Sequence, residues 1–132
     1  MLSSQKGWIV LLLVVVALML GGCRTATIHN VKDAPVHANQ GQITQQQVGD
    51  AIVRAGADLG WQMRREGNGH IVGILSIRDH RAEVDITYDQ RSYDISYRDS
   101  RNLRHDGENI HKNYNSWVSN LDNRIQSRLL AL

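Results

Sequence analysis

Two neighbouring stretches of alternating apolar and polar residues constrain the fold of this 132-residue chain more than any other feature. Over residues 81–88 an apolar side chain follows each polar one, and residues 92–98 repeat the pattern. Successive side chains of a β-strand point to opposite faces of the sheet, so this pattern is typical of strands with one buried face. We therefore expect two strands joined as an antiparallel hairpin. The apolar positions are Ala82, Val84, Ile86 and Tyr88 in the first stretch, and Tyr93, Ile95 and Tyr97 in the second.

The same stretches predict how the hairpin pairs. Two registers keep both apolar sets on one face of the sheet, one with a two-residue loop and one with a four-residue loop over residues 89–92. The two-residue loop would need positive φ at residues that are neither Gly nor Asn, and it would place like charges opposite one another. The four-residue loop fits a type I turn and sets Val84 opposite Tyr97 and Glu83 opposite Arg98. We predict the four-residue loop.

Helical periodicity lies on either side of the predicted strands. Thr44 and Gln47 have the spacing of a capping box, and Gly60 suits the end of a helix, which predicts a helix over residues 45–59. A second stretch with helical spacing, from residue 110 to 129, predicts a helix at the end of the chain. The apolar positions are Val48, Ala51, Ile52, Ala55 and Leu59 in the first helix, and Ile110, Tyr114, Trp117, Val118, Leu121, Ile125 and Leu129 in the second.

The order of these elements predicts the fold class. Residues 61–66 and 70–77 add two strands, and the second of these has apolar residues on both faces, as is typical of a strand inside a sheet. Each helix has one apolar face, so we expect both helices to pack on one side of the sheet. The predicted fold is α+β. It is a single small domain over residues 43–132, with the order α-β-β-β-β-α and a four-stranded antiparallel meander.

The first 23 residues have the features of a secretory signal. Lys6 precedes an uninterrupted apolar run over residues 8–20, which is short for a membrane-spanning helix. The next residues, Leu20-Gly21-Gly22-Cys23, resemble the lipobox of bacterial lipoproteins. This resemblance implies a signal peptide over residues 1–22, cleavage between Gly22 and Cys23, and acyl chains such as palmitate on Cys23. The alternatives are a membrane-spanning anchor, and an unmodified thiol in an ordinary signal peptide or membrane helix.

The lipoprotein resemblance also predicts a location. Arg24 stands where an aspartate would retain enteric-type lipoproteins in the inner membrane, so we expect the outer membrane, with the domain facing the periplasm. Several acyl chains on one residue make a durable anchor, whereas a single chain binds membranes only marginally. Residues 24–42 lack hydrophobic periodicity and contain the only proline, Pro35. We therefore expect residues 23–42 to form a lipidated N-terminus and flexible tether.

A longer resemblance covers residues 43–125. The chain is similar to a group of small bacterial lipoproteins with a helix, a strand meander ending in Tyr-x-Ile-x-Tyr, a Ser-x-Asn-Leu stretch, and Ile-His-x-Asn-Tyr-Asn-x-Trp opening the last helix. The matching segments here are YDISY at residues 93–97, SRNL at residues 100–103 and IHKNYNSW at residues 110–117. The group has no established activity, so this likeness supports the fold and the location and adds no chemistry.

The charge, cysteine and histidine content argues against a nucleic-acid partner, a disulfide and a zinc site. After residue 22 the chain has 14 basic and 13 acidic residues, a formal net charge of +1, because Lys6 is the only charged residue before that point. The chain has no unopposed basic block, so we expect no nucleic-acid partner. Cys23 is the only cysteine, so the fold holds without a disulfide. The six histidines lack the spacing of a zinc site, and we expect no metal and no cofactor.

One stretch gathers most of the residues suited to chemistry. It covers the loop after the last predicted strand and the expected first turn of the last helix, where His111 and Asn115 would share a helix face. No serine stands in a Gly-x-Ser-x-Gly elbow, so we predict no catalytic residue. Capping and loop hydrogen bonds explain the same residue types. The candidate cluster is Ser100, Asn102, His105, Asp106, His111, Asn113 and Asn115.

Two functions are consistent with these patterns. The first is a non-catalytic binding or adaptor module, anchored by lipid at the outer membrane, with an envelope protein or the cell wall as its partner. The second is a small hydrolase-like envelope enzyme that uses the candidate cluster at residues 100–115. The expected lack of an active-site motif favours the first.

The lipobox predicts a simple outcome for Cys23→Ala. Removing the sulfur removes the acylation site, and cleavage by the lipoprotein signal peptidase depends on that acylation. We expect an uncleaved precursor without acyl label, measured by metabolic labelling with radioactive palmitate and by gel mobility. A labelled and processed Cys23→Ala protein would contradict the interpretation of the lipobox.

Overall fold

The computed structural model describes residues 5–12 and 24–132. The predicted signal cleavage site at Gly22 and the lipidation site at Cys23 lie outside the described residues. Residues 5–12 are helical, and among the described residues no helix is long and apolar enough to cross a membrane. The remaining elements are β1 (Thr25–Thr27), β2 (Val31–Pro35), α2 (Gln45–Asp58), β3 (Gln62–Gly67), β4 (His70–Ile77), β5 (His80–Tyr88), β6 (Ser92–Arg101), β7 (Asn109–His111) and α3 (Lys112–Leu130).

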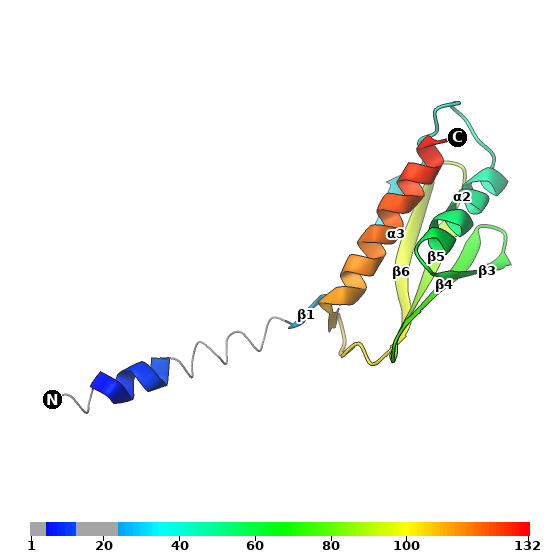
Figure 1. Ribbon diagram of the computed structural model, residues 1–132. Helices are drawn as coiled ribbons and strands as arrows, with labels where there is room; N and C mark the ends of the chain where they lie inside the picture. Colours follow the sequence, from blue (N-terminus) through cyan, green and yellow to red (C-terminus); the bar gives the residue numbers. More distant parts are fainter. Residues whose placement is uncertain (1–4, 13–23) are drawn as a thin grey trace.

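The domain is a small α+β fold whose two long helices lie on the same face of one antiparallel sheet (Figure 1). Strands β3 to β6 form the predicted four-stranded meander, and the sheet has the order β2-β6-β5-β4-β3. The apolar β4 lies inside the sheet as predicted, next to the middle strand β5. The prediction of four strands was incomplete, because β2 adds a fifth, and β1 pairs with β7 in a separate two-stranded sheet.

The prediction that residues 23–42 form a flexible tether was wrong over the part that the structure describes. Strand β2 pairs with β6, and Val31 and Ala34 are buried in the core. Strand β1 pairs with β7, and the amide of Ile28 donates to the carbonyl of Glu108 over 2.7 Å. The chain is therefore part of the folded domain from Thr25 onward.

A β-bulge explains why the sequence pattern did not predict β2. Between Val31, opposite Ile95, and Ala34, opposite Tyr93, β2 has one residue more than β6. Asp33 takes a φ of 50° in this bulge, and its amide donates to a carboxylate oxygen of Asp94 over 2.6 Å. The two buried residues are consequently three apart, and the period of two is lost. Pro35, at the end of β2, is compatible with a strand at the edge of the sheet, because one side of an edge strand has no neighbouring strand to bond.

The predicted register of the β5–β6 hairpin is confirmed next to its loop and is wrong beyond Val84. Val84 lies opposite Tyr97 and the loop covers residues 89–92, as expected. The carboxylate of Asp89 fixes the turn by accepting hydrogen bonds from the amides at both positions 91 and 92. A bulge after Val84 then shifts the pairing, so that Glu83 lies opposite Asp99 instead of Arg98.

The capping residues act as the sequence predicts for α2. Thr44 and Gln47 form the reciprocal capping box, and Gly60 takes a φ of 85° just after the helix. Asp58, the last residue of α2, accepts hydrogen bonds from Arg128 at 2.7 and 2.8 Å and from Arg124 at 3.2 Å. The hydrogen bond from Arg128 is the largest influence on the pKa of Asp58, which lies below its usual value. These bonds join the end of α2 to α3.

The core lies between the sheet and the two helices. Its largest fully buried side chains include Tyr93 from β6 and Tyr114 from α3. The hydroxyl of Tyr93 donates to Asp122 and accepts from Gln126, so its polar tip is satisfied by α3. Burial raises the pKa of Tyr93 far above its usual value, and the bond to Asp122 adds to this. Tyr93 therefore fastens the middle of α3 to the sheet.

Candidate functional site

The candidate cluster lies at the end of the domain where β6 ends and α3 begins, beside β1 (Figure 1). Ser100 is within β6, and β7 occupies positions 109–111, where the sequence predicted the first turn of the last helix. His111 therefore precedes the helix, as its N-cap, and does not share a helix face with Asn115. The predicted pairing of these two side chains on one face was wrong.

Ser100 and His105 both contact Tyr97, and no hydrogen bond joins the two residues to each other. The hydroxyl of Ser100 lies 2.8 Å from that of Tyr97. The ring of His105 stacks on Tyr97, with ring centroids 4.5 Å apart, and its Nε2 lies 3.0 Å from the carbonyl of Gly107. A serine nucleophile needs a base within hydrogen-bond reach. The recorded hydrogen bonds of these two residues hold the loop.

Asn102 and Asp106 shape the two turns of this loop. Asn102 takes a φ of 58°. Its side-chain nitrogen Nδ2 donates to the carboxylate of Asp79 over 2.8 Å, and its backbone carbonyl oxygen lies 2.7 Å from Nδ1 of His80. The backbone of Asp106 exchanges two hydrogen bonds with Asn109 across a tight turn. Asn102 thereby joins the end of β6 to the β4–β5 turn.

The remaining cluster residues organise the start of α3. Nδ1 of His111 accepts a hydrogen bond from the amide of Asn113, which caps the helix. The side chain of Asn115 holds the N-terminal segment with both of its polar atoms. Its Oδ1 accepts from the amide of His29, and its Nδ2 donates to the carbonyl of Thr27, each over 2.9 Å. Asn115 thus fixes β1 to α3.

The face of the sheet opposite the helices carries a chain of charged side chains. Arg81 donates to Glu83 at 2.7 Å, and Arg98 donates to Asp85 at 2.8 Å, while His70 lies 2.7 Å from the same Asp85 oxygen. Partial burial alone would raise the pKa of Asp85, but the bonds from His70 and Arg98 outweigh it and the pKa lies below the usual value. Among the described residues, no group of three His, Cys, Asp or Glu side chains is placed to hold a metal ion.

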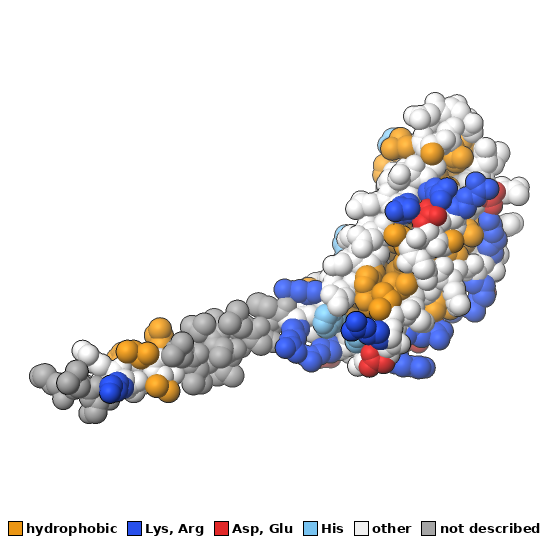
Figure 2. Space-filling view, in the orientation of Figure 1, with side chains coloured by type: hydrophobic (Ala, Val, Ile, Leu, Met, Phe, Trp, Pro, Cys, Tyr) orange, Lys and Arg blue, Asp and Glu red, His pale blue; other side chains and the backbone are white. Residues whose placement is uncertain are grey.

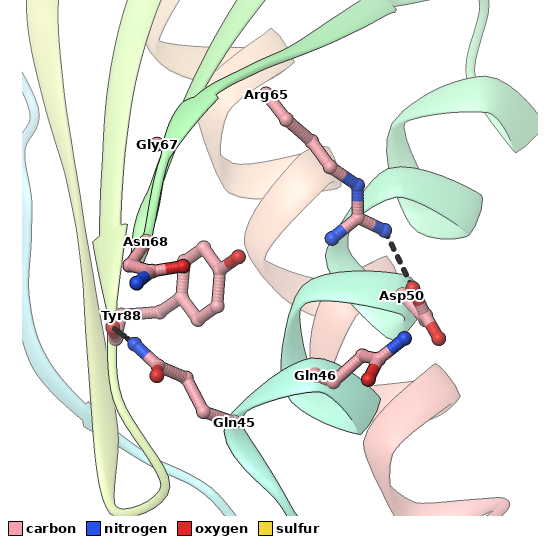
Figure 3. A pocket seen from close by; sticks show the side chains of 8 residues that line it. Gln45, Gln46, Asp50, Arg65, Gly67, Asn68 and Tyr88 are labelled. Carbon is pink, nitrogen blue, oxygen red and sulfur yellow. Dashed lines mark hydrogen bonds and ion pairs between the residues drawn. The ribbon is translucent and has the colours of Figure 1, made fainter.

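A polar pocket lies at the other end of the domain from the candidate cluster (Figure 3). The strand pairing places the two sites at opposite ends of β5. The β3–β4 turn, beside the pocket, lies next to Thr87 at the end of β5, whereas Arg81, at the start of β5, pairs with the end of β6 beside the candidate cluster. The pocket has a volume of about 480 Å³. It lies between the first turns of α2, the β3–β4 turn and the end of β5, and its lining residues are Gln45, Gln46, Asp50, Arg65, Gly67, Asn68, Gly69 and Tyr88.

Two interactions join the side chains that line the pocket. Arg65 donates to Asp50 over 2.5 Å, and Gln45 donates to the carbonyl of Tyr88 over 3.3 Å (Figure 3). The amides of Gln46 and Asn68 and the hydroxyl of Tyr88 take no part in them. The pocket therefore presents donors and acceptors that have no partner among residues 5–12 and 24–132, beside a neutral ion pair.

Comparisons of the chain with protein-family models, curated proteins and solved structures give no match. The site is therefore interpreted from its own geometry. Sequence reasoning missed the pocket because its residues come from three separate segments. Gly49, a glycine inside a predicted amphipathic helix, was the one local signal, since such a glycine often permits a close approach.

The two hydrogen bonds of Asn115 predict a measurable contribution to stability. Asn115→Ala should lower the free energy of unfolding by about 1 to 2 kcal/mol, because the backbone groups of Thr27 and His29 lose their partner. Asn113→Ala is the matched control, since Asn113 is exposed on the same helical turn and its side chain forms no hydrogen bond with the part of the chain that the structure describes. Denaturant midpoints of the two variants that coincide would contradict the role of Asn115.

Proposed function

We propose that this protein is a lipid-anchored envelope protein that acts as a non-catalytic binding or adaptor module on the periplasmic side of the outer membrane. The anchor is the lipid on Cys23, which the lipobox pattern implies. The partner is an envelope protein or the cell wall, and we propose no nucleic-acid partner. The observation that carries the proposal is the position of the polar pocket, at the end of the domain away from the point where the chain enters it.

The position of β1 in the sequence supports the proposal that the domain is held close to the membrane. Only Arg24 separates Cys23 from Thr25, where the chain enters β1. An extended residue spans at most about 3.6 Å, so the anchored Cys23 would lie within about 7 Å of the β1–β7 sheet. Exposed basic side chains at this end include Arg24, Arg104 and Lys112, and Figure 2 shows basic groups here as well as on the other half of the domain. Such groups favour contact with anionic lipid headgroups.

This placement gives the two ends of the domain different environments. The end that carries β1, β7 and the candidate cluster would face the membrane. The end that carries the polar pocket would face the periplasm, with the charged face of the sheet along the side. A module of this kind can present its distal pocket to a partner in the periplasm while its near end stays at the bilayer.

The recorded bonds of the candidate cluster favour binding over catalysis. Ser100 is bonded to Tyr97, His105 to the Gly107 carbonyl, and His111 to the amide of Asn113. Each of these polar groups serves the loop or the helix cap, and none of the three bonds pairs a nucleophile with a base. The enzyme alternative would require hydrolysis by the purified full chain of a cell-wall or ester substrate, and loss of that activity in His111→Ala.

Crosslinking in intact cells tests the orientation. A photoreactive amino acid at Asn68, in the pocket, should capture an envelope protein or cell-wall fragment, identified by mass spectrometry. The same amino acid at Arg104, also on an exposed turn but at the other end, is the control and should capture phospholipid. Capture of the protein partner at position 104 and not at position 68 would contradict the proposed orientation.

Membrane fractionation tests the location. We expect the wild-type chain in the outer membrane, and Arg24→Asp in the inner membrane, because aspartate after the lipidated cysteine is the retention signal of enteric-type sorting. Arg24→Lys is the matched control, since it keeps the positive charge and should stay in the outer membrane. An unchanged distribution of Arg24→Asp would show that this rule does not govern the protein.

A further inference from the structure

We propose that the polar pocket between α2, the β3–β4 turn and the end of β5 binds a carbohydrate. The inference rests on the proposed function, because it names the kind of cell-wall partner that a distal pocket would meet. The pocket's volume, about 480 Å³, is within the range of roughly 300 to 1,000 Å³ that is typical of small-ligand sites. Such sites are usually lined by apolar groups, and this one is not, so its ligand must be polar.

The chemistry of the lining matches hydroxyl groups. Gln46 and Asn68 each offer an amide donor and an amide acceptor, Tyr88 offers a hydroxyl, and Asp50 a carboxylate. Each sugar hydroxyl donates one hydrogen bond and accepts others, so a pyranose needs donors and acceptors side by side. Figure 3 shows Asn68 and Tyr88 on the side of the strands, and Gln46 and Asp50 on the side of the helix, with the amide of Gln46 directed toward Asp50.

A buried glycine of α2, Gly49, makes room for the ends of two side chains that line the pocket. A Cβ added at Gly49 would lie 2.5 Å from the hydroxyl of Tyr88 and 2.9 Å from NH1 of Arg65. Any side chain there would force Tyr88 and Arg65 to shift, and so the tyrosine hydroxyl and the guanidinium reach the helix at this point only because residue 49 is glycine. The tyrosine hydroxyl and the guanidinium thereby lie at one site, where both can form hydrogen bonds with a ligand.

The charges select against anionic ligands. Within the pocket Arg65 is paired with Asp50, so the lining is close to neutral. A second hollow of about 340 Å³ shares Gln45, Asn68, Gly69 and Tyr88 with the first, and it carries three carboxylates, at Asp33, Asp89 and Asp94. Phosphorylated ligands and nucleotides would be repelled there, whereas sugar hydroxyls can donate to carboxylates. Two adjoining hollows on either side of the β3–β4 turn suit a ligand longer than one sugar ring.

Titration of the full chain with a defined glycan tests this inference. The protein is purified in a zwitterionic detergent without a sugar headgroup, because maltoside or glucoside detergents would compete. The probe is the β-1,4-linked tetrasaccharide of N-acetylglucosamine, followed by nuclear magnetic resonance of the backbone amides. We expect saturable shifts confined to residues 45–50, 65–69 and 87–89.

Two variants and a control connect binding to the pocket. Gly49→Ala should weaken binding about tenfold or more, because its methyl group displaces the Tyr88 hydroxyl and Arg65, although alanine is the better helix former. Asn68→Ala should weaken binding about three- to tenfold through loss of one amide. Asn123→Ala, an exposed amide on α3 outside both hollows, should bind like the wild type.

Three results would overturn the proposal. They are no saturable shift with the tetrasaccharide, shifts that map outside the pocket, or equal binding by Gly49→Ala, Asn68→Ala and the wild type. Spermidine is titrated in parallel, and saturable shifts of the same amides with spermidine alone would identify a cation site instead. A negative result with the glycan would leave the proposed function intact if Cys23 is acylated and position 68 still captures an envelope protein.

Discussion

One apolar layer, between the helices and a single face of the sheet, is the constraint on which the rest of this structure depends. Ile52 from α2, Ile86 from β5, and Tyr114, Ile125 and Leu129 from α3 are fully buried in it. Because both helices cover the same face, the other face stays open, and its charged side chains pair among themselves instead of being buried. Polar side chains lie at both ends of the sheet, in the candidate cluster at one end and in the polar pocket at the other.

The two ends of the sheet are used differently. At one end, the polar residues of the loop after β6 and the start of α3 hold backbone in place, and the bonds of Asn115 to Thr27 and His29 attach the N-terminal strand. At the other end, amides and a tyrosine hydroxyl stand beside a pocket without bonding to one another. Polar groups that hold the fold and polar groups that remain available are thus separated by the length of the strands, and this separation supports the proposed binding role for the distal end.

Local patterns predicted the regular elements, and tertiary contacts decided the rest. The capping box at Thr44 and Gln47 and the alternation in β5 depend on neighbours in sequence, and both were predicted correctly. Strand β2 was missed because a bulge at Asp33 breaks its period, and a bulge shifted the partner of Glu83. Neither bulge has a local signature in the sequence, because each depends on how two strands meet.

The candidate cluster could be predicted in part and the pocket could not, again because tertiary contacts decide what sequence patterns cannot show. The sequence placed Ser100, His105 and His111 near one another, and the structure does bring them to one end of the domain. Their hydrogen-bond partners, such as Tyr97 and Gly107, were not predictable, and those partners give the residues a structural role. The pocket joins Gln46, Asn68 and Tyr88 from three segments, so only the folded chain reveals it.

The folded domain starts at β1, two residues after the proposed lipid anchor, and the proposed orientation at the membrane depends on this short distance. Hydrogen–deuterium exchange of the full chain in detergent tests it at the amides of Ile28, His29 and Val36. All three are hydrogen-bonded, to Glu108, Asn115 and Arg91 respectively. The structure predicts exchange at these amides many times slower than in an unstructured peptide. Exchange at the unstructured rate across residues 25–36 would show a flexible tether and would contradict the claim.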